Sequence, residues 1–359
     1  LKAMLDAGGT DLHISTGTPP VVRLDGKIVP LKTPALGPVE SKQLCYSVLT
    51  EAQKHRFEEN RELDFSFGVK GLARFRGNVY LQKGNVAGAF RLIPFKLPEF
   101  EDLGLPEVIR RLSEKPRGLI LVTGPTGSGK STSLASMINM INRDRREHII
   151  TIEAPIEYSH PHRGCLVNQR EVGEDTNSFT RALKSILRQD PDVVLVGELR
   201  DRETIEAAMT IAETGHLTFA TLHTNSAVQS INRIIDVFEP HQQSQIRTQL
   251  SFVLEGVLTQ ALLPKPSGGR ALAVEVMVPN DAIRALIRDN KVHQIYSQMQ
   301  LGPGAHAMQT FNQSLSDLIQ RGVISRELGL SRSSNEDELE MMLLEGKGLA
   351  QVSHQPRNR

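Results

Sequence analysis

The chain has 359 residues, of which 39% are hydrophobic and 23% are charged, and its formal net charge is +1. These values are typical of a globular protein of two or three domains. A nearly neutral chain lacks the strong positive field that attracts nucleic acid or acidic membranes. The two cysteines form no CxxC pair, which disfavours a zinc site and a disulfide framework. No apolar run reaches the ~18 residues that cross a bilayer, so we expect a cytoplasmic protein without a membrane span.

Residues 1–98 predict an N-terminal α+β domain. Two short apolar runs, 21–24 and 27–29, flank the Asp25-Gly26 dipeptide, which is a strong signal for a β-hairpin. Residues 40–59 have helical spacing, and Thr50 is a plausible N-cap. Residues 63–95 then alternate between apolar and polar side chains. The pattern predicts an antiparallel sheet with helices on one face.

Residues 99–117 read as a linker with one short helix, and residues 118–280 as an ATPase core. In the core, apolar strands at 118–123, 148–152, 193–196, 217–221 and 271–278 alternate with helices that begin near Ser131, Ser178, Arg202, Ser226 and His241. This alternation predicts a mainly parallel sheet with helices on both faces and a ligand at the carboxyl ends of its strands. Residues 281–330 look helical. The polar tail, 331–359, predicts at most one short helix, near residues 336–344, and disorder elsewhere.

A glycine-rich loop lies between the first strand and the first helix of this core. It reads GPTGSGKS and, with the next threonine, comprises Gly124, Pro125, Thr126, Gly127, Ser128, Gly129, Lys130, Ser131 and Thr132. The glycines let backbone amides curl around an anion, and the helix N-terminus adds partial positive charge. Lys130 can reach the terminal phosphates, and Ser131 can hold Mg²⁺. The loop therefore predicts binding of a nucleoside triphosphate, ATP with Mg²⁺.

Carboxylates follow the second and third strands of the core. Hydrolysis requires one carboxylate that activates the attacking water and another that helps to hold Mg²⁺. Glu153 and Glu157 lie at the end of the second strand, and either could instead be a solvated surface residue. Glu198 follows Gly197, which is itself preceded by four apolar residues. In P-loop ATPases an aspartate usually stands where this chain has Gly197. We expect Glu198 to contact the Mg²⁺ shell directly or through water.

Histidines and arginines complete the set of candidates. His216 and His223 bracket the fourth strand, and we expect each to lie at or beyond a strand end, where a histidine can sense a terminal phosphate. Buried structural histidines are the alternative. Arg74, Arg76 and Arg91 come from strands of the N-terminal domain and could neutralise transition-state charge. Considered on their own, these arginines are better explained as residues of a solvent-exposed strand face than as catalytic groups.

Together these residues resemble one family. The segments GPTGSGKS, TIEAPIEY, DPDVVLVGELRD and GHLTFATLHT are similar to the Walker A, Asp box, Walker B and His box of the type II/type IV secretion ATPase superfamily. The segment DAIRALIR, from Asp281, resembles the C-terminal motif of type IV pilus retraction ATPases, the twitching-motility motors. The resemblance covers the chain to about residue 331. The Asp box usually reads IEDPIE, and Ala154 stands where its aspartate is expected.

The resemblance implies a PAS-like N-terminal domain, a RecA-like P-loop ATPase domain with a mainly parallel sheet, and C-terminal helices. It also implies a ring-shaped homohexamer that works against an inner-membrane pilus platform protein, peripheral to that membrane at the pilus base. By position, Glu157 becomes the water-activating base, Glu198 the Walker B acid, and His216 and His223 the His-box pair. Arg76 and Arg91 match the N-terminal-domain arginines that reach a nucleotide.

Other functions remain open at this stage. A pilus assembly or type II secretion ATPase of the same superfamily is the first alternative, although those relatives often carry a tetracysteine zinc insertion that this chain lacks. A nucleic-acid motor would need basic patches and stacking aromatics, whereas aromatics are only 4% and Trp is absent. Ala154 keeps a third possibility open, a nucleotide-responsive adaptor without turnover.

Overall fold

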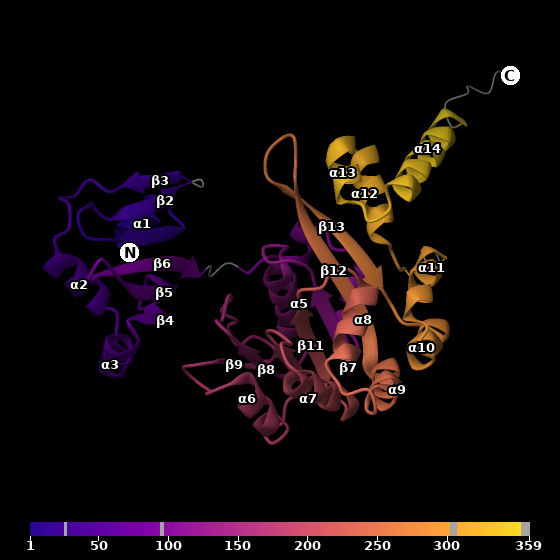
Figure 1. Cartoon of the computed structure of the whole chain (residues 1–359), viewed down its shortest axis with the longest axis horizontal. Coiled ribbons are helices and arrows are strands. Elements are labelled where there is room, and N and C mark those ends of the chain that lie inside the picture. The colour runs from indigo at the N-terminus through magenta and orange to yellow at the C-terminus, as the bar shows by residue number, and fades with distance from the viewer. Residues whose placement is uncertain (25–26, 94–96, 302–306, 353–359) are drawn as a thin grey trace. The chain divides into compact units, whose positions relative to one another are not determined.

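The computed structural model of the chain describes residues 1–24, 27–93, 97–301 and 307–352, and it divides into two compact units (Figure 1). The first unit contains residues 1–97, and the second begins at residue 98. Two short segments from the middle of the chain, 154–159 and 171–175, belong to the first unit. The predicted contiguous N-terminal domain did not include these segments, which lie at the ends of strands.

The first unit is built on a six-stranded antiparallel sheet. Its strand order is β3-β2-β1-β6-β5-β4. The strands are β1 (Asp11–Ile14), β2 (Val21–Leu24), β3 (Lys27–Pro30), β4 (Glu62–Val69), β5 (Ala73–Gln82) and β6 (Asn85–Ile93). Leu24 pairs with Lys27, as the predicted hairpin requires, while the Asp25-Gly26 turn itself lies outside the described residues.

Alternation along the strands divides this sheet into an apolar and a polar face. In β5, Phe75 and Val79 are fully buried, whereas Arg74 and Arg76 point to the other face. Helices α1 (Lys2–Asp6), α2 (Pro38–Tyr46) and α3 (Glu51–Asn60) accompany the sheet. The predicted N-cap of α3 is confirmed, because the Thr50 hydroxyl accepts from the Gln53 amide and the Gln53 side chain returns the bond.

The second unit contains a seven-stranded sheet of order β13-β12-β7-β11-β10-β8-β9, in which the neighbours from β12 to β8 run parallel. The strands are β7 (Gly118–Thr123), β8 (His148–Glu153), β9 (Leu166–Glu171), β10 (Val193–Val196), β11 (Leu217–Leu222), β12 (Leu254–Pro264) and β13 (Arg270–Met277). Strands β7, β10 and β11 are buried along their whole length, as expected for a sheet covered on both faces. Pattern reading missed β9 and β12, because neither is continuously apolar.

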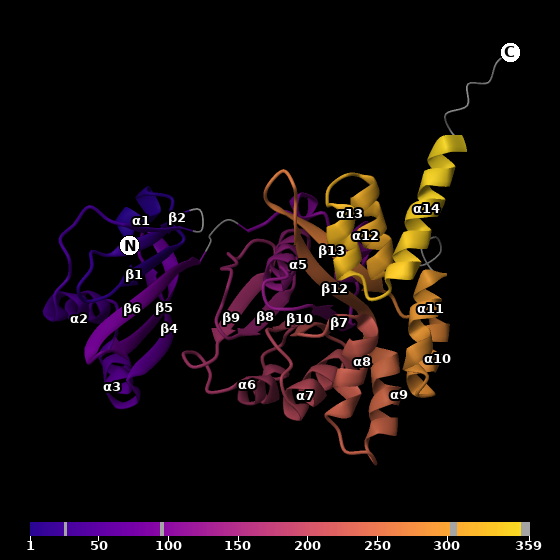
Figure 2. The same cartoon turned by 45° about the horizontal axis from the view of Figure 1, so that its top comes forward.

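Helices cover both faces of the parallel sheet, and α6 to α9 lie together along one side (Figures 1 and 2). The elements of this part of the chain are η1 (Phe100–Leu103), α4 (Glu107–Ser113), α5 (Lys130–Asp144), α6 (Phe179–Ile186), α7 (Arg202–Glu213), α8 (Ala227–Asp236) and α9 (Gln243–Val253). Side chains of α4 and α5 share one core with the sheet, including Leu112, Met137, Ile138 and Phe219. The architecture confirms the predicted fold class.

The C-terminal part is more ordered than its composition indicates. Its elements are α10 (Asp281–Arg288), η2 (Val292–Gln294), α11 (Ile295–Gln300), α12 (Phe311–Gln320), α13 (Arg326–Arg332) and α14 (Glu336–Val352). The expectation of one short helix and otherwise disorder in the tail is wrong for the described residues, since α14 has 17 residues. Leu339 and Leu343 anchor it in a small core with α12 and β12–β13, and residues 353–359 lie outside the described part. Among the described helices, none combines the length and the apolar character that a membrane crossing needs.

Candidate functional site

The glycine-rich loop has a backbone conformation that favours glycine at three positions. Gly124, Gly127 and Gly129 adopt φ values of 136°, 79° and 92°, a region that L side chains rarely adopt. A Cβ on Gly124 would lie 2.3 Å from the Gln260 carbonyl oxygen and 2.7 Å from the Ser128 hydroxyl. The loop leads from β7 into the N-terminus of the 15-residue helix α5. The result is a cradle of backbone amides at a helix N-terminus, which suits a phosphate chain.

Side chains of the loop have the orientation that phosphate binding needs. The Lys130 ammonium lies against the loop and donates to the carbonyl oxygens of Gly124 at 2.8 Å and Pro125 at 3.1 Å. Ser128 is buried, and its hydroxyl has no hydrogen-bond partner among the described residues, so a polar group is available inside the cradle. Ser131 follows Lys130 in the first turn of α5 and is half-buried. The residues present therefore fit a bound nucleotide with its Mg²⁺.

The carboxyl ends of four parallel strands meet beside this loop. Thr123 of β7 pairs with Leu222 of β11, and Val196 of β10 pairs with both Ala220 of β11 and Ile152 of β8. The loop, His223, Glu198 and Glu153 each end or follow one of these strands. The predicted gathering of motifs at one edge of the sheet is therefore found for these positions.

Glu198 is the best-connected acid of this edge. Its Oε1 lies 3.2 Å from His223 Nε2, and its Oε2 lies 2.7 Å from Arg200. Gly197, before it, donates to the Ile152 carbonyl at 2.8 Å, and a Cβ there would lie 3.1 Å from the same oxygen. Gly197 thus allows the close approach of the β8 backbone. Because Gly197 stands at the position of the expected aspartate, the carboxylate of this strand end comes from Glu198. Mg²⁺ commonly binds one or two carboxylates plus substrate phosphates, so this set fits it without a cage of protein ligands.

The two histidines do not lie together. His223 follows the carboxyl end of β11, whereas His216 precedes its amino end, and six residues separate those ends by roughly 20 Å. The His216 ring contacts the Ile211 carbonyl at 3.0 Å and the Thr214 hydroxyl at 3.2 Å. Each histidine lies beyond a strand end, as expected. Within one chain, however, only His223 lies at the edge that carries the loop.

The two candidate bases, Glu153 and Glu157, have different surroundings at the end of β8. Glu153 ends β8 and accepts from the Thr151 hydroxyl at 2.6 Å and from Gln169 at 3.2 Å, so its carboxylate is tied into the sheet. Glu157 is exposed, in the segment 154–159 that belongs to the first unit. Its neighbour Ile156 is buried and anchors this segment. Of the two carboxylates, Glu157 is therefore the exposed one and Glu153 the one bound into the sheet.

The arginines of the first unit differ in how firmly carboxylates hold them. Arg74 is bound to buried Glu171 at 3.0 Å. Arg76 and Arg91 face each other across β5 and β6, and their side chains are 46% and 69% exposed. Asp64 lies 4.0 Å from Arg76, and Asp11 lies 2.7 Å from Arg91. Arg76 is thus the arginine with the most distant carboxylate, whereas Arg74 and Arg91 each bind a buried carboxylate, although the Arg91 side chain is still largely exposed.

Ala154 lines a small hollow of the first unit with a volume of about 200 Å³. Arg56, Arg76, Asp64, Glu171 and Glu174 contribute its charged groups. Ala154 thus stands where the Asp-box pattern predicts an aspartate, in a hollow that holds two guanidinium groups and three carboxylates. Pattern reading did not identify Glu171, because it closes a strand, β9, that the pattern does not indicate.

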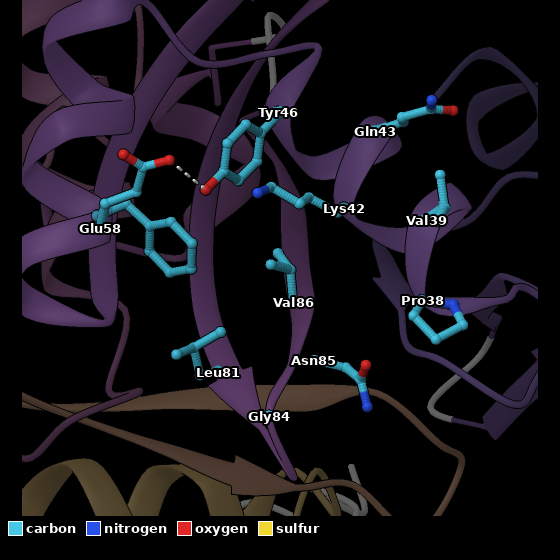
Figure 3. Close-up of a pocket in the computed structure, with 11 residues that line it drawn as sticks. Pro38, Val39, Lys42, Gln43, Tyr46, Glu58, Leu81, Gly84, Asn85 and Val86 are labelled. Atoms are coloured by element: carbon cyan, nitrogen blue, oxygen red, sulfur yellow. Dashed lines mark hydrogen bonds between the residues drawn. The ribbon is translucent and has the colours of Figure 1, made fainter.

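A larger hollow of about 660 Å³ lies between α2, α3 and the β5–β6 hairpin (Figure 3). Within it, the Tyr46 hydroxyl donates to Glu58 at 3.2 Å, and the Lys42 ammonium lies 4.8 Å from the centre of the Tyr46 ring. Burial and the Glu58 carboxylate raise the pKa of Tyr46. The residues that line this hollow include none of the predicted nucleotide contacts, so it does not belong to the candidate site.

Comparison with known proteins places the chain in a family. The model of the family described as "Type II/IV secretion system protein" matches residues 94–328. The chain belongs to this family. It is 50% identical over 320 residues to the type IV pilus retraction ATPase PilT of Pseudomonas aeruginosa, a match that covers 89% of this chain and 93% of that protein. It is also 41% identical over 344 residues to the type IV pilus ATPase PilU of the same organism, covering 96% and 90% of the two proteins.

A solved structure extends this similarity to the fold. A crystal structure of the pilus retraction motor PilT with bound ADP superimposes with a TM-score of 0.90 at 52% identity, covering 95% of this chain and 97% of that one. Both units of this chain therefore have counterparts in a secretion-family motor that binds a nucleotide. The predicted resemblance is confirmed, and it extends beyond the residues of the motifs to nearly the whole chain.

Proposed function

We propose that this chain is a Mg²⁺-dependent ATPase motor that retracts type IV pili and so drives twitching motility. The observation that carries the proposal is the similarity to a pilus retraction ATPase over nearly the full length of both proteins, joined to a loop whose glycines and lysine are arranged for phosphates. Similarity restricted to the ATPase core would not separate retraction from assembly or secretion. The match to both units favours retraction.

In the proposed reaction, the loop amides and Lys130 bind the phosphates, and Ser131 and Glu198 hold Mg²⁺. Bound Mg²⁺ supplies positive charge that offsets the charge developing on the phosphate oxygens. Glu157 accepts a proton from water as the water oxygen attacks the terminal phosphorus, and the bond from that phosphorus to the bridging oxygen breaks with its electron pair on ADP. His223, bound to Glu198, responds to the loss of the terminal phosphate.

We further propose that the motor is a homohexamer that works against a pilus platform protein of the inner membrane. Arg76 and Arg91 would stabilise the transition state from the N-terminal unit, either of the same subunit or of a neighbour. A motor that consumes ATP works where ATP is supplied, on the cytoplasmic side of the pilus base. His216 does not enter this proposal, because it lies at the other end of β11.

Two measurements test the proposal. Calorimetry of the assembled protein should detect Mg–ATP binding, and the Glu157→Gln variant should retain that binding while losing at least about 10²-fold in hydrolysis. Expression of the chain in a strain that lacks its own retraction motor should restore pilus retraction, and the Glu157→Gln variant should not. A folded chain without affinity for Mg–ATP would refute the proposal.

A further inference from the structure

Glu171 is a buried carboxylate outside the motifs, and one of its oxygens collects three hydrogen bonds. The side chain is 4% exposed, at the end of β9. Its Oε2 accepts from the Ser66 hydroxyl at 2.8 Å, from the Arg74 guanidinium at 3.0 Å and from the Ile156 amide at 3.3 Å. The Arg74 guanidinium also donates to Ser66 at 2.7 Å, which closes the cluster. A single oxygen therefore joins β4, β5 and the segment 154–159.

A buried carboxylate is costly unless its charge and its lone pairs are satisfied. Here Arg74 supplies the opposite charge, while Ser66 and Ile156 supply further donors. The backbone around Glu171 is also fixed, because its amide donates to Asp175 at 2.8 Å and its carbonyl accepts from the Asp175 amide at 2.8 Å. The hydrogen bonds of both the side chain and the backbone of Glu171 thus fix its carboxylate. The Ile156 amide therefore donates to an acceptor that is held in place.

The Ile156 amide lies one peptide unit before Glu157, the proposed water-activating base. Ile156 is itself 3% exposed, so its side chain and its amide together fix the backbone on which exposed Glu157 stands. We propose that Glu171 is a positioning residue for Glu157. Through the hydrogen bonds that join Ser66, Arg74, Glu171 and Ile156, it holds the backbone of Glu157 in a fixed position relative to strands β4 and β5. The inference rests on the proposed function, because Glu171 has a base to position only if Glu157 activates water in ATP hydrolysis.

The same cluster gives the first unit a connection to the chemistry. Arg74 is on β5, two residues before Arg76, on the polar face of the sheet. A displacement of β4 and β5 would be transmitted through Arg74 and Glu171 to the backbone of the base. Rate enhancement of this kind depends on the placement of the reacting groups, and displacement by 1 Å can cost about 10²-fold. Loss of the cluster should therefore affect turnover much more than binding.

The test replaces the carboxylate by an amide of the same shape, Glu171→Gln, in the assembled full-length protein. We expect kcat for ATP hydrolysis to fall by about 10- to 10²-fold while KM changes by less than about threefold, since the role of Glu171 is to fix the backbone of the proposed base and not to bind the nucleotide. The matched control is Glu62→Gln, an exposed carboxylate at the start of β4, the strand that carries Ser66, and it lines neither hollow of the first unit. This control should keep the wild-type rate.

A second pair of variants separates positioning from general stability. In the Glu157→Gln background, adding Glu171→Gln should cause no further loss, because the group that Glu171 positions has already been removed. If Glu171→Gln prevents folding, Ser66→Ala removes one donor from the same oxygen and should lower kcat by about two- to fivefold, again without a change in KM.

The outcomes distinguish this inference from the proposed function. An equal loss in the wild-type and Glu157→Gln backgrounds, or a wild-type kcat in Glu171→Gln, overturns the positioning role while leaving the ATPase intact. A wild-type rate in Glu157→Gln itself overturns the proposed function instead. A kcat loss that depends on Glu157, with binding of Mg–ADP preserved in calorimetry, supports the positioning role.

Discussion

The Nε2 of His223 lies 3.2 Å from Oε1 of Glu198, and Arg200 holds the other oxygen of the same carboxylate at 2.7 Å. One acid of the site is therefore held between two basic side chains from different loops. Glu198 has only 22% of its side chain exposed, so these contacts fix its orientation. An oriented carboxylate can hold Mg²⁺ without first losing side-chain freedom.

Replacing His223 by alanine should disorder Glu198 and remove a donor that faces the site. We expect kcat to fall by about 10- to 10²-fold, with nucleotide affinity nearly preserved. Steady-state hydrolysis and calorimetry with Mg–ADP would measure the two quantities. His216→Ala is the informative comparison, because His216 lies at the opposite end of the same strand and should cost less than about threefold. Equal losses in the two variants would show that the two histidines act together despite their separation.

Replacing Lys130 by alanine should abolish hydrolysis, because no other side chain of the loop carries a positive charge to the phosphates. The rate should fall by at least about 10³-fold in a phosphate-release assay. Lys70→Ala, which removes an exposed lysine from the first unit, provides the control for loss of charge alone. Full turnover by the Lys130 variant would refute the assignment of the loop.

Replacing Ala154 by aspartate restores the carboxylate that the family pattern expects. Ala154 shares a hollow with Arg56 and Arg76, so the new charge would have two guanidinium groups nearby, along with the carboxylates of Asp64, Glu171 and Glu174. We expect kcat to rise by about two- to tenfold, with Ala154→Asn as the uncharged control of nearly equal size. An adaptor without turnover would be inactive in both the natural protein and the Ala154→Asn variant and become active only as Ala154→Asp. An unaltered rate in Ala154→Asp would show that the position tolerates the loss of the acid.

The sequence predicted the family, the fold class and the motor function, all of which are confirmed, because each depends on local patterns. Strands β7, β10 and β11 are continuous apolar runs, and the loop has a fixed spacing of glycines. Helix starts near Ser178 and Ser226 were readable because their hydroxyls cap the helices. The predictions of site residues, such as Glu157 and Arg91, stay predictions.

Features that depend on contacts distant in sequence were not predictable in this way. Strand β9 mixes polar and apolar residues, so its pattern does not single out Glu171, yet this residue bonds Arg74 from 97 positions away. Helix α14 was underestimated for a similar reason, since the tail 331–359 is polar as a whole but Leu339 is fully buried by partners from earlier elements.

Both cysteines should resist alkylation in the folded protein. Burial raises the pKa of Cys45 to about 12, and it also raises the pKa of Cys165. At pH 8 a thiol with a pKa of about 12 is deprotonated in only about one molecule in 10⁴, and the thiolate is the reactive form. Intact-mass spectrometry after iodoacetamide at pH 8 should show no adduct, and two adducts should appear once the chain is unfolded in guanidinium. Rapid modification of the folded protein would mean that one thiol is exposed.

Replacing Leu339 by alanine should destabilise the second unit, because this side chain of α14 has no solvent exposure and packs with Leu315 and Leu263. Truncating a buried leucine removes its transfer free energy and leaves a cavity, so we expect the free energy of unfolding to fall by about 2–4 kcal/mol. Met341→Ala, which truncates a side chain 60% exposed on the same helix, should change it by less than about 0.5 kcal/mol. Urea unfolding followed by circular dichroism would measure both variants. Equal stability of the two would mean that α14 does not dock on the core formed by α12 and β12–β13.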